Sequence, residues 1–355
     1  MEEKAIKQLE NIDPLLPLLL DRLRVFYEAA QNRGALRAPI RHYSIAGLHF
    51  QAEMPDPVLA DKLLCAFEPM RDDGLKGPAD LIWRAFEAPT NLNRGDVSPS
   101  PTAPGIHGVI FAGRDHDLIA ERQLTCDSVF EPASKTIFTV CWAADELTRY
   151  AVAKPLLRFL YLTLYAQNKL VTHAALVGRN DKGIVVTGRG GSGKTTTSAA
   201  ALLRGFDFVS DDYVCMSKQG ARFVGETLFA SLMLDVGHIR RFPKLAEAAL
   251  FPPSDLETKA VVYPMRLFPG QVQRSMNIVA VIVPLLSDHA ETRLAPMSKA
   301  AALRALAPSS VYSSPWREPS RFDFYHQMLK ELPCFHLELG RDVDGITLPL
   351  EDLLR

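Results

Sequence analysis

Cysteine is scarce in this sequence, and no two of its cysteines form a CxxC pair. The chain holds five of them, at Cys65, Cys126, Cys141, Cys215 and Cys334. An odd number of scattered cysteines without the spacing of metal ligands indicates reduced, mostly structural thiols. We therefore expect a cytoplasmic protein.

The chain also lacks an excess of charge of one sign and a long hydrophobic run. Its formal net charge is −1, so nothing at the level of the whole chain indicates nucleic acid or a membrane surface as a partner. The apolar run Leu15–Leu20 carries Pro17, is too short to span a membrane and has no cleavage site after it. The sequence thus predicts neither a signal peptide nor a transmembrane segment.

What remains is the composition of a soluble globular protein. The chain has 355 residues, of which 47% are hydrophobic and 23% charged. This length is enough for roughly two domains. We find no internal repeat and no low-complexity tract.

The first part of the chain predicts a helix followed by a strand-rich region. Asp13 as N-cap and Pro14 at the first helical position predict a helix over residues 13–31, ended by Gly34. Short strands are predicted at Tyr43–Gln51, Ala79–Glu87, Gly108–Phe111 and Lys135–Trp142, with a flexible loop at Ser98–Gly105. We divide the chain into an N-terminal helix (1–34), a smaller strand-rich domain without a chemical motif (35–150) and a catalytic domain (151–355).

A glycine-rich stretch organises the rest of the chain. Between a predicted strand, Ile184–Thr187, and a predicted helix, Thr195–Leu203, the sequence fills the pattern G-x-x-x-x-G-K-[ST]. A loop that wraps phosphates needs backbone angles that glycine adopts easily, and the following helix offers free N–H groups and its positive dipole end. The predicted nucleotide-binding residues are Gly188, Arg189, Gly190, Gly191, Ser192, Gly193, Lys194, Thr195 and Thr196. Lys194 is expected on the β/γ-phosphates and the Thr195 hydroxyl on Mg²⁺.

Two acidic residues follow the next predicted strand, Phe206–Val209. Asp211 and Asp212 are expected to face the phosphates, because ligands of α/β sheets gather at the carboxyl ends of strands. One acid can serve the metal shell while the other accepts a proton from an attacking hydroxyl. A surface pair in a turn is the alternative. His173, in the predicted strand Lys169–Val177, is on its own either functional or a satisfied core histidine.

Further elements complete the predicted catalytic domain. Helices are predicted at Ala153–Asn168, Ser298–Leu306 and Phe322–Leu332. Strands are predicted at Val214–Ser217, Arg222–Val224, Leu228–Leu234, Asn277–Pro284, Phe335–Leu339 and Gly345–Leu348. The apolar strand Asn277–Pro284 is expected at the centre of a sheet.

The stretch from His173 to Val214 resembles the catalytic core of the HPr kinase/phosphorylase family, which is related to the ATP-type phosphoenolpyruvate carboxykinases. In that family a histidine precedes the phosphate-binding loop by one hairpin, and a helix ending in Arg-Gly leads to an Asp-Asp pair. This sequence has His173, Arg204-Gly205 and Asp211-Asp212 at matching spacings. The resemblance implies an α/β fold with a P-loop kinase core of this type, built on a mixed sheet with helices.

The resemblance also implies a role for each site residue. Lys194 would bind the transferred phosphate, Thr195 and Asp211 would serve the metal, and Asp212 would be the base. His173 would lie beside the γ-phosphate. The counterpart of a further metal-side carboxylate is Asp235, and that of a family arginine is Lys259, for which a plain solvated lysine is the alternative.

Two family segments differ in this chain. The Leu-Glu-Ile-Arg-Gly signature is replaced by Leu234-Asp-Val-Gly-His238, and the Arg-Pro-Gly-Arg-Asn segment by Gly270–Asn277. These segments relate to the phosphorylase activity and to the protein substrate HPr. The chain therefore looks more like divergent HPr-kinase-like proteins, some of which, such as lasso-peptide tailoring kinases, act in peptide tailoring.

We interpret the chain as an ATP- and Mg²⁺-dependent kinase that phosphorylates a hydroxyl, most simply a serine of a protein or peptide. By analogy with the family, a homo-oligomer is expected. One alternative is a carboxykinase-like enzyme acting on a small acid, for which Lys169 or Lys154 would have to supply a metal ligand. The other alternative is a non-catalytic nucleotide-binding switch.

Overall fold

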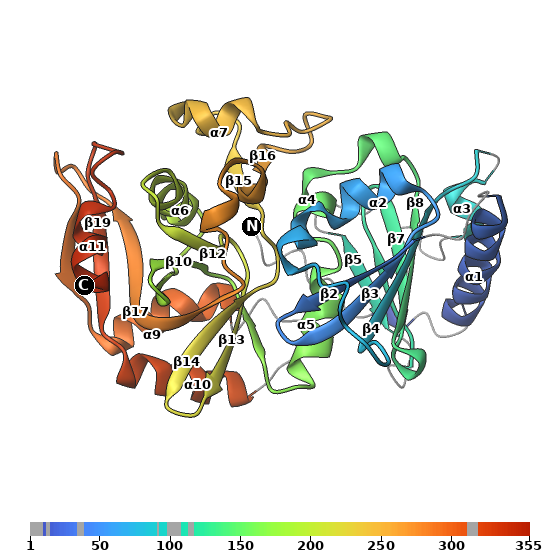
Figure 1. Ribbon diagram of the computed structural model, residues 1–355, viewed down its shortest axis with the longest axis horizontal. Helices are drawn as coiled ribbons and strands as arrows, with labels where there is room; N and C mark the ends of the chain where they lie inside the picture. Colours follow the sequence, from blue (N-terminus) through green and yellow to red (C-terminus); the bar gives the residue numbers. More distant parts are fainter. Residues whose placement is uncertain are drawn as a thin grey trace. The chain divides into compact units, whose positions relative to one another are not determined.

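The computed structural model describes residues 10–11, 15–33, 39–90, 92–97, 108–112, 117–310 and 319–355. The chain forms two compact units (Figure 1). The first comprises Met1–Phe159 and Phe251–Lys259, and the second comprises Leu160–Leu250 and Ala260–Arg355. Both contain helices and mixed sheets, so the fold class is α/β. Among the described residues, no helix is long and apolar enough to cross a membrane.

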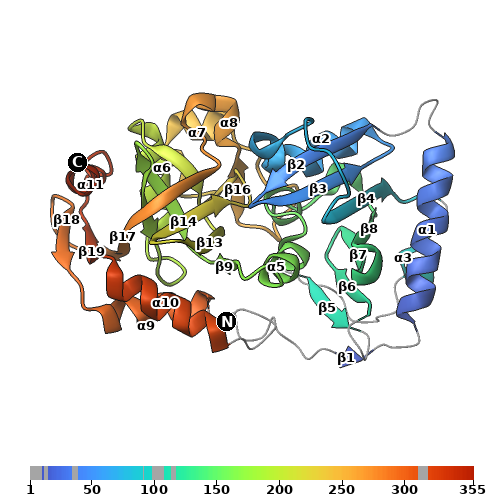
Figure 2. The same ribbon diagram turned by 60° about the horizontal axis from the view of Figure 1, so that its bottom comes forward.

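The first unit is built on an eight-stranded sheet with the order β1-β5-β6-β7-β8-β4-β3-β2 (Figure 2). Its strands are β1 (Glu10–Asn11), β2 (Ile40–Ile45), β3 (Leu48–Glu53), β4 (Leu81–Glu87), β5 (Val109–Ala112), β6 (Ile119–Arg122), β7 (Cys126–Glu131) and β8 (Thr136–Cys141). The run from β5 to β8 is antiparallel, whereas β4 lies parallel to both β8 and β3. The strand-rich composition of this region is therefore explained by one continuous sheet.

The predicted single strand Tyr43–Gln51 is wrong, because the chain turns back on itself in its middle. Strands β2 and β3 form an antiparallel hairpin around Ala46 and Gly47. Both turn residues have positive φ, 47° and 79°, the combination that matches the twist of a tight hairpin. Apolar residues continue on both sides of the turn, so their presence alone hid it.

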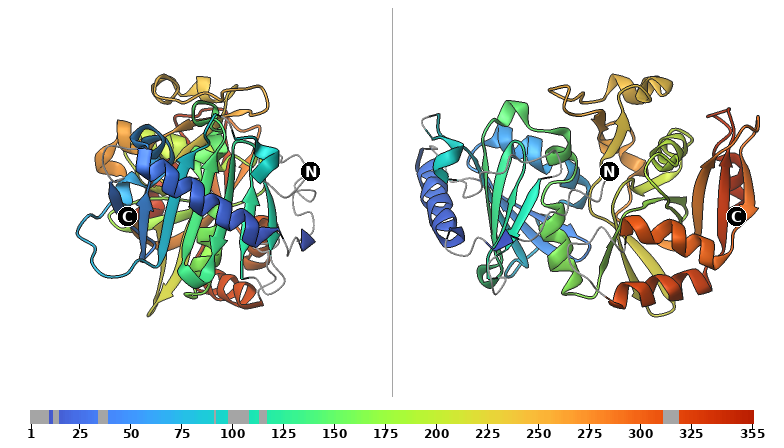
Figure 3. Two further views of the ribbon diagram at one scale, coloured as in Figure 1. Left: turned by 90° about the vertical axis from the view of Figure 1, so that its right-hand side faces the viewer. Right: turned by 180° about the vertical axis from the view of Figure 1, so that it is seen from behind.

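Helices cover both faces of this sheet. The helix α1 (Leu16–Arg33) lies across one face and buries its apolar side against Phe86, Phe138 and Val140 (Figure 3). This confirms the predicted N-terminal helix, although Asp13, Pro14 and Gly34 lie outside the described residues, as does the predicted loop Ser98–Gly105. The other described helices of the unit are α2 (Pro57–Leu64), η2 (Cys65–Met70), α3 (Arg94–Val97), η3 (Pro132–Ser134), η4 (Ala144–Glu146) and α4 (Arg149–Ala153).

The second unit has a nine-stranded mixed sheet. The main path runs β12-β10-β11-β17-β14-β13-β9, and β19 pairs with both β17 and β18. The bounds are β9 (Leu170–Thr172), β10 (Ala175–Arg179), β11 (Lys182–Val186), β12 (Asp207–Ser210), β13 (Val214–Gln219), β14 (Arg222–Thr227), β17 (Ser275–Leu286), β18 (Arg293–Pro296) and β19 (Cys334–Leu339). As predicted, the apolar β17 lies inside the sheet, with β11 along one edge and β14 and β19 along the other.

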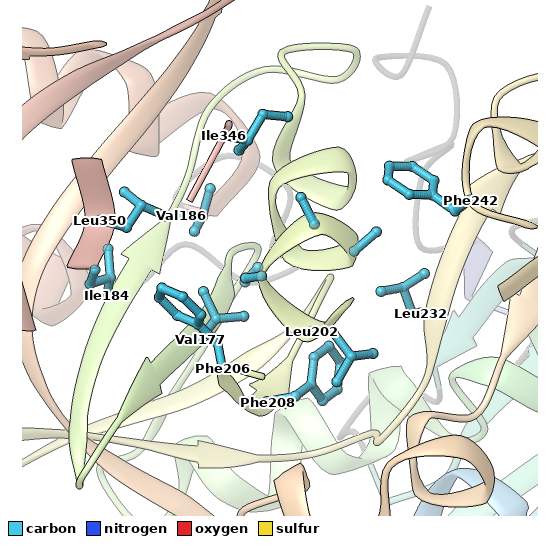
Figure 4. Packing of buried hydrophobic residues seen from close by; sticks show 14 of the residues in the cluster. Val177, Ile184, Val186, Leu202, Phe206, Phe208, Leu232, Phe242, Ile346 and Leu350 are labelled. Carbon is cyan, nitrogen blue, oxygen red and sulfur yellow. The ribbon is translucent and has the colours of Figure 1, made fainter. Parts of the chain in front are cut away.

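Two helical layers enclose this sheet. On one face, α6 (Lys194–Leu203) and α11 (Leu348–Leu354) pack against side chains such as Val177, Ile184 and Val186 (Figure 4). On the other face, α9 (Lys299–Ser310) and α10 (Pro319–Glu331) pack against Leu176, Val185 and Val281. Neighbouring residues of one strand thus enter different cores, as expected for a sheet that is buried on both sides.

The remaining elements of the second unit are short. A separate two-stranded sheet is formed by β15 (Leu232–Asp235) and β16 (Lys259–Val262), of which Lys259 counts with the first unit. The short helices are η5 (Ile239–Arg241), α7 (Pro243–Glu247), α8 (Pro264–Leu267) and η6 (Pro269–Gln271).

Three predicted elements of this region are wrong. The strand predicted at Lys169–Val177 is two strands, since His173 and Ala174 leave the ladder between β9 and β10. Gly345–Leu348 is a turn that leads into α11, because Ile346, Leu350 and Leu354 repeat at helical spacing and are buried. The long helix predicted at Ala153–Asn168 is divided into α4 and α5 (Leu157–Tyr165) by Pro155 and by Leu156, whose φ is 58°.

Candidate active site

The glycine-rich loop connects β11 to α6, as the sequence predicted. Gly193 directly precedes the helix with a φ of 105°, and a Cβ there would lie 2.4 Å from Leu339 Cδ1. Gly188 has a φ of 142°, also in the range that side-chain-bearing residues rarely adopt. The loop therefore depends on glycine at both of its ends, while Arg189, Gly190 and Gly191 are exposed at its tip.

Lys194 is folded back across this loop. Its ammonium group donates hydrogen bonds to the carbonyl oxygens of Gly188 (2.8 Å) and Arg189 (3.2 Å), and the residue is only 7% exposed. Nearby, the buried hydroxyls of Thr187 and Ser192 have no hydrogen-bond partner within the described part of the chain. A buried cation beside unpaired hydroxyl donors fits a ligand that carries anionic oxygens.

The first carboxylate of the acidic pair reaches the start of α6. Asp211 is buried, and its Oδ2 accepts a hydrogen bond of 3.1 Å from the Thr195 hydroxyl. A threonine hydroxyl with a carboxylate behind it matches the oxygen ligands that Mg²⁺ takes when phosphates and water complete its shell. Among the described residues, no three His, Cys, Asp or Glu side chains cluster as a metal site. A metal at Thr195 and Asp211 would therefore depend on ligands from the nucleotide.

The second carboxylate of the pair contacts His173. The distance from His173 Nε2 to Asp212 Oδ1 is 2.6 Å, and the two side chains are 17% and 20% exposed. The ring of Tyr213 stacks on the imidazole, with 5.1 Å between ring centroids and 20° between planes. Asp212 and His173 can therefore share a proton while remaining open to solvent or a ligand.

Strand pairing explains why these distant residues meet. His173 occupies the break between β9 and β10, and Asp212 occupies the turn between β12 and β13. The register places Val214 opposite Thr172 and Ser210 opposite Leu176. Because β9 pairs with β13 and β10 pairs with β12, the break that holds His173 lies beside the turn that holds Asp212.

Asp235 and the turn that follows it lie beside the same helix. Asp235 is exposed at the end of β15, and its Oδ1 accepts a hydrogen bond from the backbone N–H of Gly237 (2.9 Å). Three residues later, His238 Nε2 lies 3.0 Å from the Thr196 hydroxyl. The sequence reasoning assigned a role to Asp235 and none to His238. The sequence does carry one signal for His238, because this histidine follows a glycine directly after an apolar strand.

The three lysines considered in the sequence analysis differ in their surroundings. Lys259 is exposed at the first position of β16 and belongs to the first unit, so its relation to the loop stays a prediction. Lys169 pairs with Glu226 at 2.9 Å. Lys154 is buried in the first unit, with its ammonium 4.7 Å from the centre of the Tyr150 ring. If Lys169 supplied the metal ligand of the carboxykinase alternative, it would have to leave an existing ion pair.

Comparisons with known proteins give little further guidance. No family model matches the chain, and no curated protein matches it. Among solved structures it is similar to the Hpr(Ser) kinase/phosphatase from Coxiella burnetii, with 13% sequence identity and a TM-score of 0.26. The aligned part covers 52% of this chain and 91% of the other. A similarity this low assigns neither a family nor a function.

Proposed function

We propose that the second unit is an ATP- and Mg²⁺-dependent kinase with a P-loop core of the HPr kinase/carboxykinase type, which transfers the γ-phosphate to a hydroxyl. One observation carries the proposal. Consecutive contacts lead from Thr195 in the loop helix to Asp211, and from the adjacent Asp212 to His173. A phosphate-binding loop, a metal-side carboxylate and a carboxylate that can act as base are thereby joined in one series, and phosphoryl transfer to a hydroxyl uses all three.

Each residue has a specific part in this mechanism. Bound ATP would supply the phosphoryl group, and Mg²⁺ would neutralise charge on the phosphates. Lys194 would hold the transferred phosphate, while Thr195 and Asp211 would hold the metal. Asp212 accepts the proton of the acceptor hydroxyl, and its close contact with His173 fixes the direction of the carboxylate. The protein contributes mainly positioning and electrostatic stabilisation.

The acceptor class rests on the sequence resemblance alone. We propose a serine of a protein or peptide, because the stretch from His173 to Val214 resembles a family of serine kinases. A homo-oligomer is proposed on the same ground. A cytoplasmic location is proposed from the scattered, unpaired cysteines.

Transfer of labelled phosphate tests the proposal. The protein is incubated with γ-labelled ATP and a cell lysate, and the labelled species are identified. Lys194→Ala is expected to abolish transfer, whereas Lys218→Ala, which removes a surface lysine paired with Glu331, is expected to leave it unchanged. An unchanged rate with Lys194→Ala would remove the assigned role of this lysine.

Two other outcomes would favour the alternatives. Tight ATP binding without turnover in any lysate would indicate a nucleotide-binding switch. Decarboxylation of oxaloacetate in the presence of ATP would indicate a carboxykinase.

A further inference from the structure

We propose that His238 is a nucleotide-binding residue of this site, which donates a hydrogen bond from Nδ1 to a phosphate or ribose oxygen of the bound nucleotide. The inference rests on the proposed function, because it needs ATP on the loop between β11 and α6. It adds a residue for which neither the loop motif nor the acidic pair gives a role.

The first observation is the contact of His238 with the loop helix. His238 Nε2 lies 3.0 Å from the hydroxyl of Thr196, which directly follows Lys194 and Thr195. The first turn of α6 is also where free backbone N–H groups and the positive dipole end attract phosphate. The imidazole therefore stands next to the proposed triphosphate site.

The second observation is that His238 is held firmly in place. The residues that follow it, Ile239, Phe242 and Leu245, are buried in the core that contains Ala199 to Leu202 of α6. On the other side, the backbone N–H of His238 donates to the carbonyl oxygen of Asp235 at 2.9 Å. With its backbone fixed to the same core as the helix, the side chain is preorganised rather than mobile.

The third observation concerns the hydrogen-bonding capacity of the ring. The positive end of the helix dipole favours a lone pair, rather than an N–H, on the nitrogen that faces Thr196. The Thr196 hydroxyl then donates to Nε2, and the proton of the neutral ring resides on Nδ1. Within the described residues Nδ1 has no hydrogen-bond partner, and the side chain is partly exposed. A donor is thus available for a ligand oxygen.

The charge state of the ring agrees with this arrangement. Burial holds the pKa of His238 below its ordinary value, and Arg241 adds to the effect, while Asp235 opposes it. A lowered pKa favours the neutral form of the ring, and the side chain belongs to no described cluster of metal ligands. The assignment of His238 as a hydrogen-bond donor rests on its contact with Thr196.

Binding of a fluorescent, non-hydrolysable ATP analogue with Mg²⁺ tests the proposal. His238→Ala is expected to raise the Kd about ten- to a hundredfold, the range of a hydrogen bond to a charged acceptor. His238→Gln, which can keep both contacts, is expected to restore most of the affinity. His289→Ala serves as the matched control, since His289 is an exposed histidine that pairs with Glu338.

Competition with inorganic triphosphate identifies the oxygen that is bound. If His238→Ala weakens inorganic triphosphate as strongly as ATP, Nδ1 contacts a phosphate. If only ATP is weakened, Nδ1 contacts the ribose. Either result supports the proposal, and equal affinities of wild type and His238→Ala for both ligands would overturn it.

Transfer by the wild type separates the proposed function from the role of His238. If the wild type binds the ATP analogue but transfers no labelled phosphate, the proposed function fails while the binding data still decide the role of His238. If Lys194→Ala loses binding while His238→Ala does not, only the role of His238 fails. If His238→Ala is unstable, the binding test is replaced by a measurement of the ¹⁵N resonance of His238 Nδ1 in the wild type. This resonance is expected to report a protonated Nδ1 that shifts on nucleotide addition, and no shift would refute the contact.

Discussion

At the scale of single residues, the pair formed by Asp212 and His173 is the most informative contact. The short distance of 2.6 Å between Oδ1 and Nε2 orients the carboxylate before any substrate arrives. The adjacent Asp211 is buried and directed to Thr195 instead. Two neighbouring acids of the same type are therefore directed to different partners, Asp211 to Thr195 and Asp212 to His173.

This division predicts a separation of catalysis from binding. Asp212→Asn is expected to lower kcat by about 10²–10⁴-fold, the usual contribution of a general base, with little change in nucleotide Kd. The check is single-turnover transfer together with ATP-analogue binding. Asp344→Asn, which changes an exposed carboxylate paired with Arg204, is the control. A loss of nucleotide affinity without loss of kcat would make Asp212 a metal ligand instead.

At the scale of elements, the loop between β11 and α6 owes its shape to individual glycines. Gly193→Ala would place a methyl group 2.4 Å from Leu339 Cδ1 at a φ of 105°. Such strain costs about 1–3 kcal/mol, so we expect a lower midpoint in urea and weaker nucleotide binding. Gly270→Ala, outside the loop, is the control, because nothing lies within 4 Å of its Cβ position and its φ is not positive. Similar losses for both variants would contradict this explanation.

The element scale also shows where local patterns mislead. His173 lies in an apolar stretch that suggests one strand, yet the chain breaks there and β9 and β10 pair with different partners. The break is what frees the imidazole from the ladder and directs it to Asp212. The same limit applies to Ala46 and Gly47, where a hairpin turn interrupts an apolar run. Strand breaks of this kind follow from pairing across the sheet, which a local window cannot contain.

At the scale of the whole molecule, all residues in the series from Thr195 to His173 belong to the second unit. Nucleotide binding should therefore stabilise that unit. At an ATP-analogue concentration of 100 times the Kd, linkage gives about 2.7 kcal/mol. Hydrogen exchange is expected to slow in β11, α6 and β12 but not in β4 and β8 of the first unit. Removing Mg²⁺ with a chelator, or Lys194→Ala, should cancel the effect, and equal protection in β4 and β8 would contradict it.

The thiols offer a second test that covers the whole chain. Cys65 is the one cysteine of intermediate exposure, and the other four are buried as free thiols. Burial raises the pKa of the Cys215 thiol, and the neighbouring Cys126 together with burial raises that of Cys141. Little thiolate therefore forms at Cys215 and Cys141 at pH 8. A disulfide reagent is expected to modify Cys65 rapidly and the other four thiols only after unfolding. Loss of the rapid reaction in a folded Cys65→Ser variant would confirm that Cys65 is the reactive thiol. Rapid reaction of more than one thiol in the wild type would contradict the prediction.

The sequence by itself determined the parts of this protein that depend on neighbouring residues. The strand, the loop and the helix from Ile184 to Leu203, the stop at Gly205 and the helix capped by Ser298 all follow from local patterns. Tertiary structure alone decided which distant side chains meet. The pairing of β9 with β13 and of β10 with β12 joins His173 to Asp212, and the packing of Ile239 against α6 brings His238 to Thr196. These contacts are set by register and burial across the sheet, and neither leaves a local pattern in the chain.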